Sequence, residues 1–143
     1  MPAWKKRAAQ AENELANLLW ELGYAVVRGP SSGSGTRRRF QPDLIAVKDG
    51  RVLVIEVKTC DPESTVYVPR GQVEGLREFA RRAGGMVFIA LKIRGHGWRL
   101  HRLEDLESTR GGGVKVRDPF SGMKPRELDE ILFPGSRRIT EFL

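Results

Sequence analysis

The stretch that decides the fold runs over residues 42–58 and reads PDLIAVKDGRVLVIEVK. Two apolar runs in it are joined by the segment 48–50 (KDG), and Asp-Gly between β-prone runs is a strong hairpin signal. Asp43 begins the first strand of this predicted hairpin, and Glu56 lies near the end of the second. Because antiparallel pairing brings those two ends together, the hairpin can bring the two carboxylates to one spot.

The second strand carries charge where the pattern otherwise predicts burial. Glu56 and Lys58 share one face of the strand, because side chains alternate, and Val57 takes the other face. The preceding residues 52–55 are all apolar, and a charged pair in such a strand is costly unless it is internally paired or binds a metal. An isolated Glu-x-Lys is most often a structural ion pair, so the interpretation as a site depends on further residues.

A divalent cation would relieve the repulsion between two converging carboxylates. Mg²⁺ is usually held by one or two carboxylates, several waters and substrate phosphate oxygens. It lowers the pKa of a bound water and polarises a phosphoryl oxygen. A lysine ammonium such as that of Lys58 can orient the attacking water or stabilise the charge that develops on the phosphate.

A third carboxylate precedes the hairpin. Residues 5–22 have the apolar spacing of an amphipathic helix that ends at Gly23, and a short β-prone run follows over 24–28. Glu12 lies at the margin of the apolar stripe, on the side that faces the sheet, so it can reach a site on the sheet. The alternative is an acid of the first turns that the helix dipole favours.

The remaining elements complete a mixed fold. A second helix is expected from Pro69 to Gly84, then strands over 86–92 and 98–102. Helix, strand, hairpin, helix, strand, strand is typical of an α/β domain with helices packed on a central sheet. We expect a single domain over 1–143, with its core at about 5–102 and a C-terminal extension over 103–143 that contains a short helix behind Pro125.

Composition narrows the class of partner. The chain has 25 Lys+Arg against 18 Asp+Glu, a net charge of +7, which favours a polyanion and most often nucleic acid. Its single cysteine, Cys60, excludes an internal disulfide, and one cysteine with two histidines excludes a metal site rich in these residues. The longest apolar run, over 86–91, is far shorter than the ~20 residues of a membrane span. We expect a cytoplasmic, nucleoid-associated protein with no membrane association and no nucleotide cofactor.

The helix, the Pro-Asp step at 42–43 and Glu-Val-Lys at 56–58 resemble the PD-(D/E)xK nuclease superfamily, whose restriction-endonuclease-like α/β core has a mixed central β-sheet flanked by helices. The local text is similar to the archaeal Holliday junction resolvases of the Hjc/Hje type. The similarity covers roughly residues 8–102. The matching segments are 9–12 (AQAE), 18–19 (LL), 23–28 (GYAVVR), 55–58 (IEVK), 78–85 (EFARRAGG) and 97–99 (GWR).

The resemblance implies roles for individual residues. The residues that match the catalytic positions are Glu12, Asp43, Glu56 and Lys58. Asp43, Glu56 and the main-chain carbonyl of Val57 would hold Mg²⁺, and Glu12 would contact it through water. Mn²⁺ is expected to substitute for Mg²⁺. DNA contacts are implied for Arg28 and for a serine-containing loop that here holds Ser31, Ser32 and Ser34.

Two features depart from the resolvase pattern. Asn13 stands where the family often has arginine, so the role of that arginine is dispensable here or supplied elsewhere. The segment between Arg28 and Asp43 is longer than usual, which leaves the serine assignment open by a few residues. This segment also carries Arg37, Arg38 and Arg39, for which we expect contacts to the DNA backbone, a solvated loop being the alternative. We expect Tyr67 and Gln72 to support the site from nearby.

The function that the resemblance implies is hydrolysis of DNA. The protein would be a Mg²⁺-dependent, structure-selective endodeoxyribonuclease, a resolvase that makes paired nicks in four-way junctions during recombination and repair. Because the junction is close to two-fold symmetric, the resolvase is expected to be a C2 homodimer. The alternatives are a nuclease of the same superfamily that acts on duplex or flap DNA, and a DNA-binding module that has lost catalysis, although none of the four catalytic matches is missing.

Overall fold

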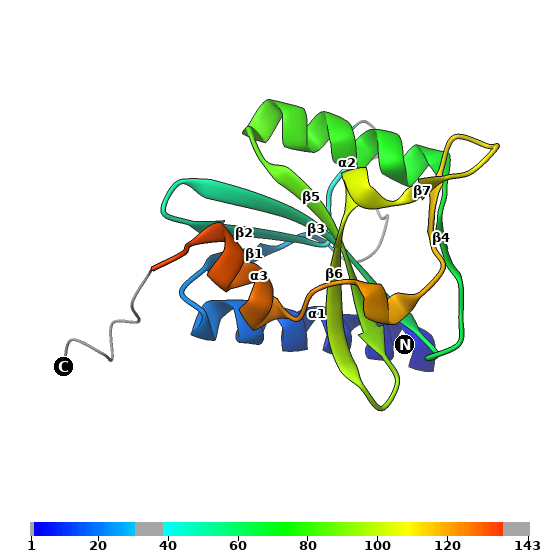
Figure 1. The fold of residues 1–143 in the computed structure, drawn as a ribbon, viewed down its shortest axis with the longest axis horizontal. Helices are drawn as coiled ribbons and strands as arrows, with labels where there is room; N and C mark the ends of the chain where they lie inside the picture. Colours follow the sequence, from blue (N-terminus) through cyan, green and yellow to red (C-terminus); the bar gives the residue numbers. More distant parts are fainter. Residues whose placement is uncertain (1, 31–38, 136–143) are drawn as a thin grey trace.

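A five-stranded mixed sheet lies at the centre of the molecule, between two helices (Figure 1). The computed structural model describes residues 2–30 and 39–135. In chain order the elements are α1 (Ala3–Glu21), β1 (Ala25–Arg28), β2 (Leu44–Lys48), β3 (Arg51–Cys60), β4 (Val66–Val68), α2 (Arg70–Ala83), β5 (Met86–Ile93), β6 (Gly97–Arg102), β7 (Glu107–Ser108), β8 (Val114–Val116) and α3 (Pro125–Leu132). Short 3₁₀ turns occupy Leu103–Asp105 and Pro119–Ser121. The predicted α/β class, with helices on a central mixed sheet, is confirmed.

The strands of the central sheet follow the order β1-β2-β3-β5-β6. All neighbours are antiparallel except β3 and β5, which α2 connects as a parallel pair. The predicted hairpin is present: Lys48 pairs with Arg51, and the turn residues Asp49 and Gly50 have φ angles of 47° and 80°. Both angles are left-handed, which is the requirement of the two-residue turn that favours Asp-Gly.

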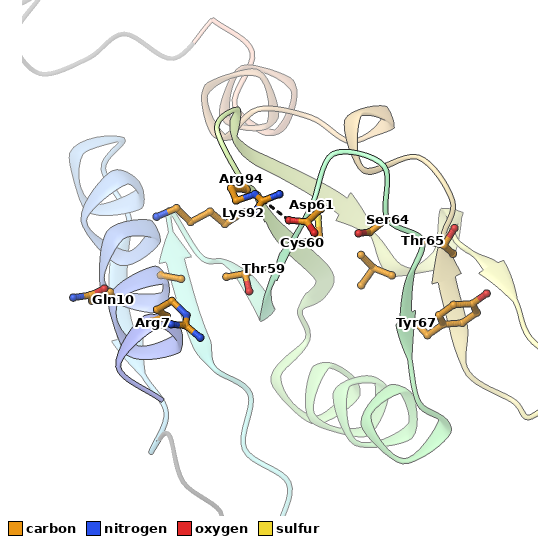
Figure 2. A pocket seen from close by; sticks show the side chains of 12 residues that line it. Arg7, Gln10, Thr59, Cys60, Asp61, Ser64, Thr65, Tyr67, Lys92 and Arg94 are labelled. Atoms are coloured by element: carbon orange, nitrogen blue, oxygen red, sulfur yellow. Dashed lines mark ion pairs between the residues drawn. The ribbon is translucent and has the colours of Figure 1, made fainter. Parts of the chain in front are cut away.

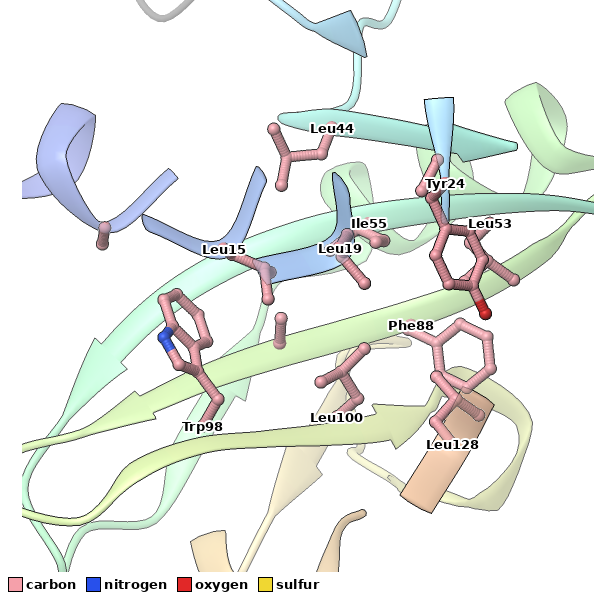
Figure 3. Packing of buried hydrophobic residues seen from close by; sticks show 13 residues of the cluster. Leu15, Leu19, Tyr24, Leu44, Leu53, Ile55, Phe88, Trp98, Leu100 and Leu128 are labelled. Carbon is pink, nitrogen blue, oxygen red and sulfur yellow. The ribbon is translucent and has the colours of Figure 1, made fainter. Parts of the chain in front are cut away.

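Each face of the sheet is covered by its own apolar cluster. Residues of α1 pack on one face, where Leu15 and Leu19 belong to the same apolar cluster as Ile55 of β3 and Phe88 of β5 (Figure 3). Residues of α2 pack on the other face, where Val73 and Leu76 belong to the same cluster as the alternate strand residues. Because neighbouring residues of one strand point to opposite faces, β3 contributes to both clusters.

The C-terminal part also packs onto these clusters. Strand β8 pairs with β4 and β7 in a small second sheet, and its Val114 and Val116 join the cluster on the α2 side. On the α1 side, Leu128 of α3 is buried in the first cluster. Lys48 fixes α3 to the hairpin, because its Nζ donates to Asp129 Oδ1 at 2.8 Å.

No helix within the described residues is both long and apolar enough to cross a membrane.

Candidate active site

The site begins where β3 extends beyond its neighbour. The last pair between β2 and β3 joins Leu44 to Ile55, whereas β5 continues to pair with β3 as far as Cys60. Asp43 directly precedes β2 and lies beside the part of β3 that has no β2 partner. Its Oδ2 accepts a hydrogen bond from the Val57 N–H at 2.8 Å. The Asp43 side chain therefore supplies the hydrogen-bond acceptor that the backbone of a longer β2 would supply, and its carboxylate is held against β3.

Glu56 lies beside this aspartate and is buried, with 6% of its surface exposed. The pKa of Glu56 is raised to about 8, first by burial and second by the charge of the nearby Asp43 carboxylate, while Lys58 opposes the shift. A carboxyl group with this pKa carries a proton over much of the neutral range. The two carboxylates converge as the hairpin predicts, and they do so in a setting that disfavours two negative charges.

Glu12 approaches the same place from α1. It is 5% exposed, and its pKa is raised first by burial and second by the charge of Asp43. Glu12 can reach Asp43 because β1 and β2 both stop short of it: Arg28 is the last residue of β1, and it pairs with Leu44, the first residue of β2. The structure thus brings Glu12, Asp43, Glu56 and Lys58 to one end of the sheet.

Arg28 connects the helix acid with its neighbour in sequence. Its Nη2 donates to Glu12 Oε2 at 3.1 Å, and its Nη1 donates to Asn13 Oδ1 at 3.2 Å. Its Nε is buried and has no hydrogen-bond partner within the described residues. Sequence reasoning treated Asn13 only as a departure from the resolvase pattern. The structure shows a contact for it, since Asn13 holds the guanidinium that also contacts Glu12.

The oxygen donors fit a cation that keeps part of its water shell. Within residues 2–30 and 39–135, no three acidic, histidine or cysteine side chains are grouped as a complete metal cage. Asp43 and Glu56 offer two carboxylates. The carbonyl of Val57 points to the same side of β3 as its N–H, which faces Asp43. Two carboxylates and a carbonyl, completed by waters and phosphate oxygens, match the ligand habits of Mg²⁺.

A groove of about 730 Å³ lies next to these residues (Figure 2). Thr59, directly after Lys58, and Ala11, directly before Glu12, both line it. Its full lining is Arg7, Gln10, Ala11, Thr59, Cys60, Asp61, Ser64, Thr65, Val66, Tyr67, Lys92 and Arg94. The groove carries more positive than negative charge, because Arg7, Lys92 and Arg94 line it with a single acid, Asp61.

The three cations of the groove differ in their pairing. Lys92 contacts Glu14, and Arg94 Nε lies 3.1 Å from Asp61 Oδ1. Arg7 forms no ion pair within the part of the chain that the structure describes. The sequence alone did not reveal this groove, because its lining comes from elements that are far apart in the chain. The only local indication was that Thr59 directly follows Lys58.

The other predicted residues fall into three groups. Ser31, Ser32, Ser34, Arg37 and Arg38 lie outside the described residues. Arg39 is described and exposed. Tyr67 lines the groove, and Gln72 of α2 has a buried Oε1 with no hydrogen-bond partner among the described residues. Among the described residues, neither Tyr67 nor Gln72 forms a side-chain hydrogen bond to the four predicted catalytic residues.

Comparisons with known proteins give a consistent result. The family model described as archaeal Holliday junction resolvase (Hjc) matches residues 3–135. Among curated proteins, the crossover junction endodeoxyribonuclease Hjc of Sulfurisphaera tokodaii is 35% identical over 128 residues, which cover 90% of this chain and 87% of that protein. The Hjc of Archaeoglobus fulgidus is 31% identical over 137 residues, 96% of this chain and 89% of that protein.

A solved structure is also similar. The 1.6 Å structure of Archaeoglobus fulgidus Hjc, described as a Holliday junction resolvase from an archaeal hyperthermophile, matches with a TM-score of 0.76 and 30% identity. The match covers 85% of this chain and 98% of that structure. Fold and sequence thus both point to the same group of proteins.

Proposed function

This chain belongs to the archaeal Holliday junction resolvase family, and we propose that it cuts four-way DNA junctions with Asp43, Glu56 and Lys58 at the free end of β3. As a member of this family it is a crossover junction endodeoxyribonuclease, a hydrolase that acts on branched DNA and depends on a divalent metal. The single observation that carries the residue assignment is the position of Asp43, whose carboxylate lies on the backbone of Val57 beside Glu56.

The proposed metal is Mg²⁺, with Mn²⁺ as a substitute. Asp43, Glu56 and the Val57 carbonyl would hold it directly, and Glu12 through a water. When bound, the ion supplies a water of lowered pKa and a positive charge for a phosphoryl oxygen. Glu56 must lose the proton that its raised pKa retains, and a neighbouring cation favours that loss.

The protein side chains supply the rest of the chemistry. Lys58 stands on the same face of β3 as Glu56, where its ammonium can position the attacking water and stabilise charge on the phosphate. Arg28 holds Glu12 in place through the contact at 3.1 Å. We propose that hydrolysis leaves 5′-phosphate and 3′-hydroxyl ends.

Recognition is proposed to depend on branch shape and phosphate position, not on base sequence. Arg7 lines the groove beside the site, where its guanidinium would bind a phosphate of the DNA strand next to the bond that is cut. Arg28, Arg39 and the loop residues Ser31, Ser32, Ser34, Arg37 and Arg38 remain proposed DNA contacts. We propose that one nuclease domain over 1–143 acts as a C2 homodimer, because two equivalent sites suit a two-fold symmetric junction.

A substrate comparison tests this function. A synthetic four-way junction and a linear duplex of the same arm sequence are incubated with the protein and Mg²⁺, and products are resolved on denaturing gels. We expect paired nicks on opposing strands of the junction and little cutting of the duplex. Equal cutting of both substrates would replace the resolvase assignment with a duplex nuclease. Junction binding with no cutting in either metal would indicate a binding module.

A further inference from the structure

Phe40 lies unusually close to helix α2. A Cβ placed on Gly75 would stand 2.3 Å from Cδ2 and 2.4 Å from Cγ of the Phe40 ring. These distances are far below van der Waals contact, so only a glycine lets the ring occupy this position. Phe40 is half-buried there and packs against the apolar cluster on the α2 side of the sheet.

The backbone of α2 gives no other reason for a glycine at position 75. The residue lies inside the helix, where glycine is less favourable than alanine. It is not among the glycines that have a positive φ. The close approach of the Phe40 ring is therefore the feature of the structure that accounts for Gly75.

The segment that follows Phe40 leads directly to the catalytic aspartate and is held at two more points. The N–H of Gly29 donates to the Asp43 carbonyl at 2.8 Å, and a Cβ on Gly29 would stand 2.2 Å from the Pro42 carbonyl oxygen. At the far end, the Asp43 carboxylate accepts from Val57 at 2.8 Å. Phe40 is the only one of these anchors that ties the segment to α2.

We propose that Phe40, seated against Gly75, is a positioning residue for Asp43. The inference rests on the proposed role of Asp43 as a metal ligand. Asp43 stands before β2, so no ladder of strand pairs fixes the chain on its N-terminal side. The ring of Phe40 supplies that restraint three residues upstream. Small displacements of a reacting group lower rates steeply, and ~1 Å can reduce a rate about 100-fold.

Truncation of the ring tests the proposal. In Phe40→Ala we expect cleavage of a saturating amount of junction to fall about 100-fold. Junction affinity, measured without a divalent metal, stays within about two-fold, while Mn²⁺ binding to the DNA-free protein, followed by titration calorimetry, weakens about ten-fold. Phe120→Ala is the matched control, because Phe120 is also a half-buried aromatic residue packed on the same cluster. It should lower the melting temperature while Mn²⁺ binding stays unchanged.

Phe40→Leu adds a conservative variant, which should recover most of the rate because an apolar side chain again fills the position. A rate and a Mn²⁺ affinity of Phe40→Ala that both match the parent protein would overturn the proposal. Equal losses of Mn²⁺ affinity in Phe40→Ala and Phe120→Ala would also overturn it, because the effect would then be a general result of a weakened core.

Gly75→Ala tests the contact from the other side. In the parent protein the new methyl group must displace the Phe40 ring, so both the rate and the melting temperature should fall. In the Phe40→Ala background the same change meets no ring, and it should raise the melting temperature because alanine favours the helix. Identical effects of Gly75→Ala in both backgrounds would overturn the contact. This thermal comparison does not involve Asp43, so it is independent of whether the metal assignment fails.

Discussion

The two halves of strand β3 differ in their neighbours and in their chemistry. Residues 51–55 pair with β2 on one side, and from Leu53 onward they also pair with β5 on the other. Leu53, Val54 and Ile55 are fully buried. Residues 56–60 pair only with β5, and this half carries Glu56, Lys58 and Thr59. One strand therefore provides both the centre of the core and the half that carries the proposed catalytic residues, here called the catalytic half, and the change occurs where β2 begins.

The difference shows how an antiparallel hairpin with one longer strand produces a site. The unpaired edge beyond Ile55 leaves a backbone N–H at Val57 with no strand partner, and Asp43 accepts its hydrogen bond. Burial of Glu56 in the same half is unfavourable without a compensating charge. The second half thus sacrifices stability for a place where a cation is favoured, as functional sites commonly do.

The largest effect is expected from Asp43→Asn. This change keeps the shape of the side chain but removes the negative charge that lies beside the catalytic half of β3. Cleavage of the junction in Mg²⁺ should fall by at least about 10³-fold. Junction binding should persist, because the carboxylate is not a phosphate contact. Cleavage is measured in single-turnover assays and binding by gel shift.

Asp49→Asn is the matched control for this change. Asp49 is an exposed turn residue with φ of 47°, and asparagine tolerates this left-handed conformation well. Its cleavage rate should equal that of the parent protein. A full rate in Asp43→Asn would show that the metal assignment is wrong.

Ile55→Ala should separate the two halves in the opposite way. This side chain is 0% exposed and lies in the cluster beneath α1, so its truncation should reduce the free energy of unfolding by about 2–5 kcal/mol. Thr59 is an exposed residue of the second half, and Thr59→Ala should change the free energy of unfolding by less than about 0.5 kcal/mol. Both values come from urea titrations at one temperature. A comparable loss in the two variants would mean that the halves contribute equally to the core.

Protonation of Glu56 gives the catalytic half its own pH dependence. Its pKa of about 8 in the folded, metal-free protein exceeds its ordinary value of 4.5, so the folded state binds the proton more tightly than the unfolded state does. The resulting stabilisation is fully present below about pH 4.5 and is lost as the pH rises to about 8. From this group alone, the metal-free protein should be less stable at pH 8 than at pH 5.

Glu56→Gln should flatten that dependence and raise the free energy of unfolding at pH 8 by an amount on the order of 1–3 kcal/mol. Urea titrations in EDTA at pH 5, 6.5 and 8 measure both effects. Glu14→Gln serves as the comparison, because the contact with Lys92 lowers the pKa of Glu14, and its stability change should not follow the same course. A parallel pH slope in Glu56→Gln and in the parent protein would refute the raised pKa.

Local sequence signals predicted the first half well. The apolar run and the Asp-Gly turn depend on neighbouring residues, and both set the register that brings Asp43 to Glu56. The position of Glu12 at the margin of the apolar stripe likewise predicted that its side chain faces the sheet. Such patterns are short-range, so a single sequence is enough to reveal them.

The surroundings of the site depend on contacts that are distant in sequence. Strand β4 has three residues and pairs with β8 almost fifty positions later, so no periodicity announces it. Phe40 meets Gly75 through tertiary packing, and neither residue carries a signal by itself. The sequence predicted a core that ends at about residue 102. Val114, Val116 and Leu128 also join the apolar clusters, because the chain folds back and brings them into contact with distant residues.

The smallest effect concerns the groove that continues from the catalytic half of β3. If Arg7 contacts a DNA phosphate there, Arg7→Ala should reduce the slope of log affinity against log salt by about 0.9 per subunit. Arg77→Ala is the control: Arg77 is exposed on α2, forms no ion pair within the described residues, and does not line the groove. Fluorescence anisotropy of a labelled junction between 50 and 300 mM salt, without divalent metal, measures both slopes. Equal slopes for the two variants would show that Arg7 makes no contact with a DNA phosphate in this groove.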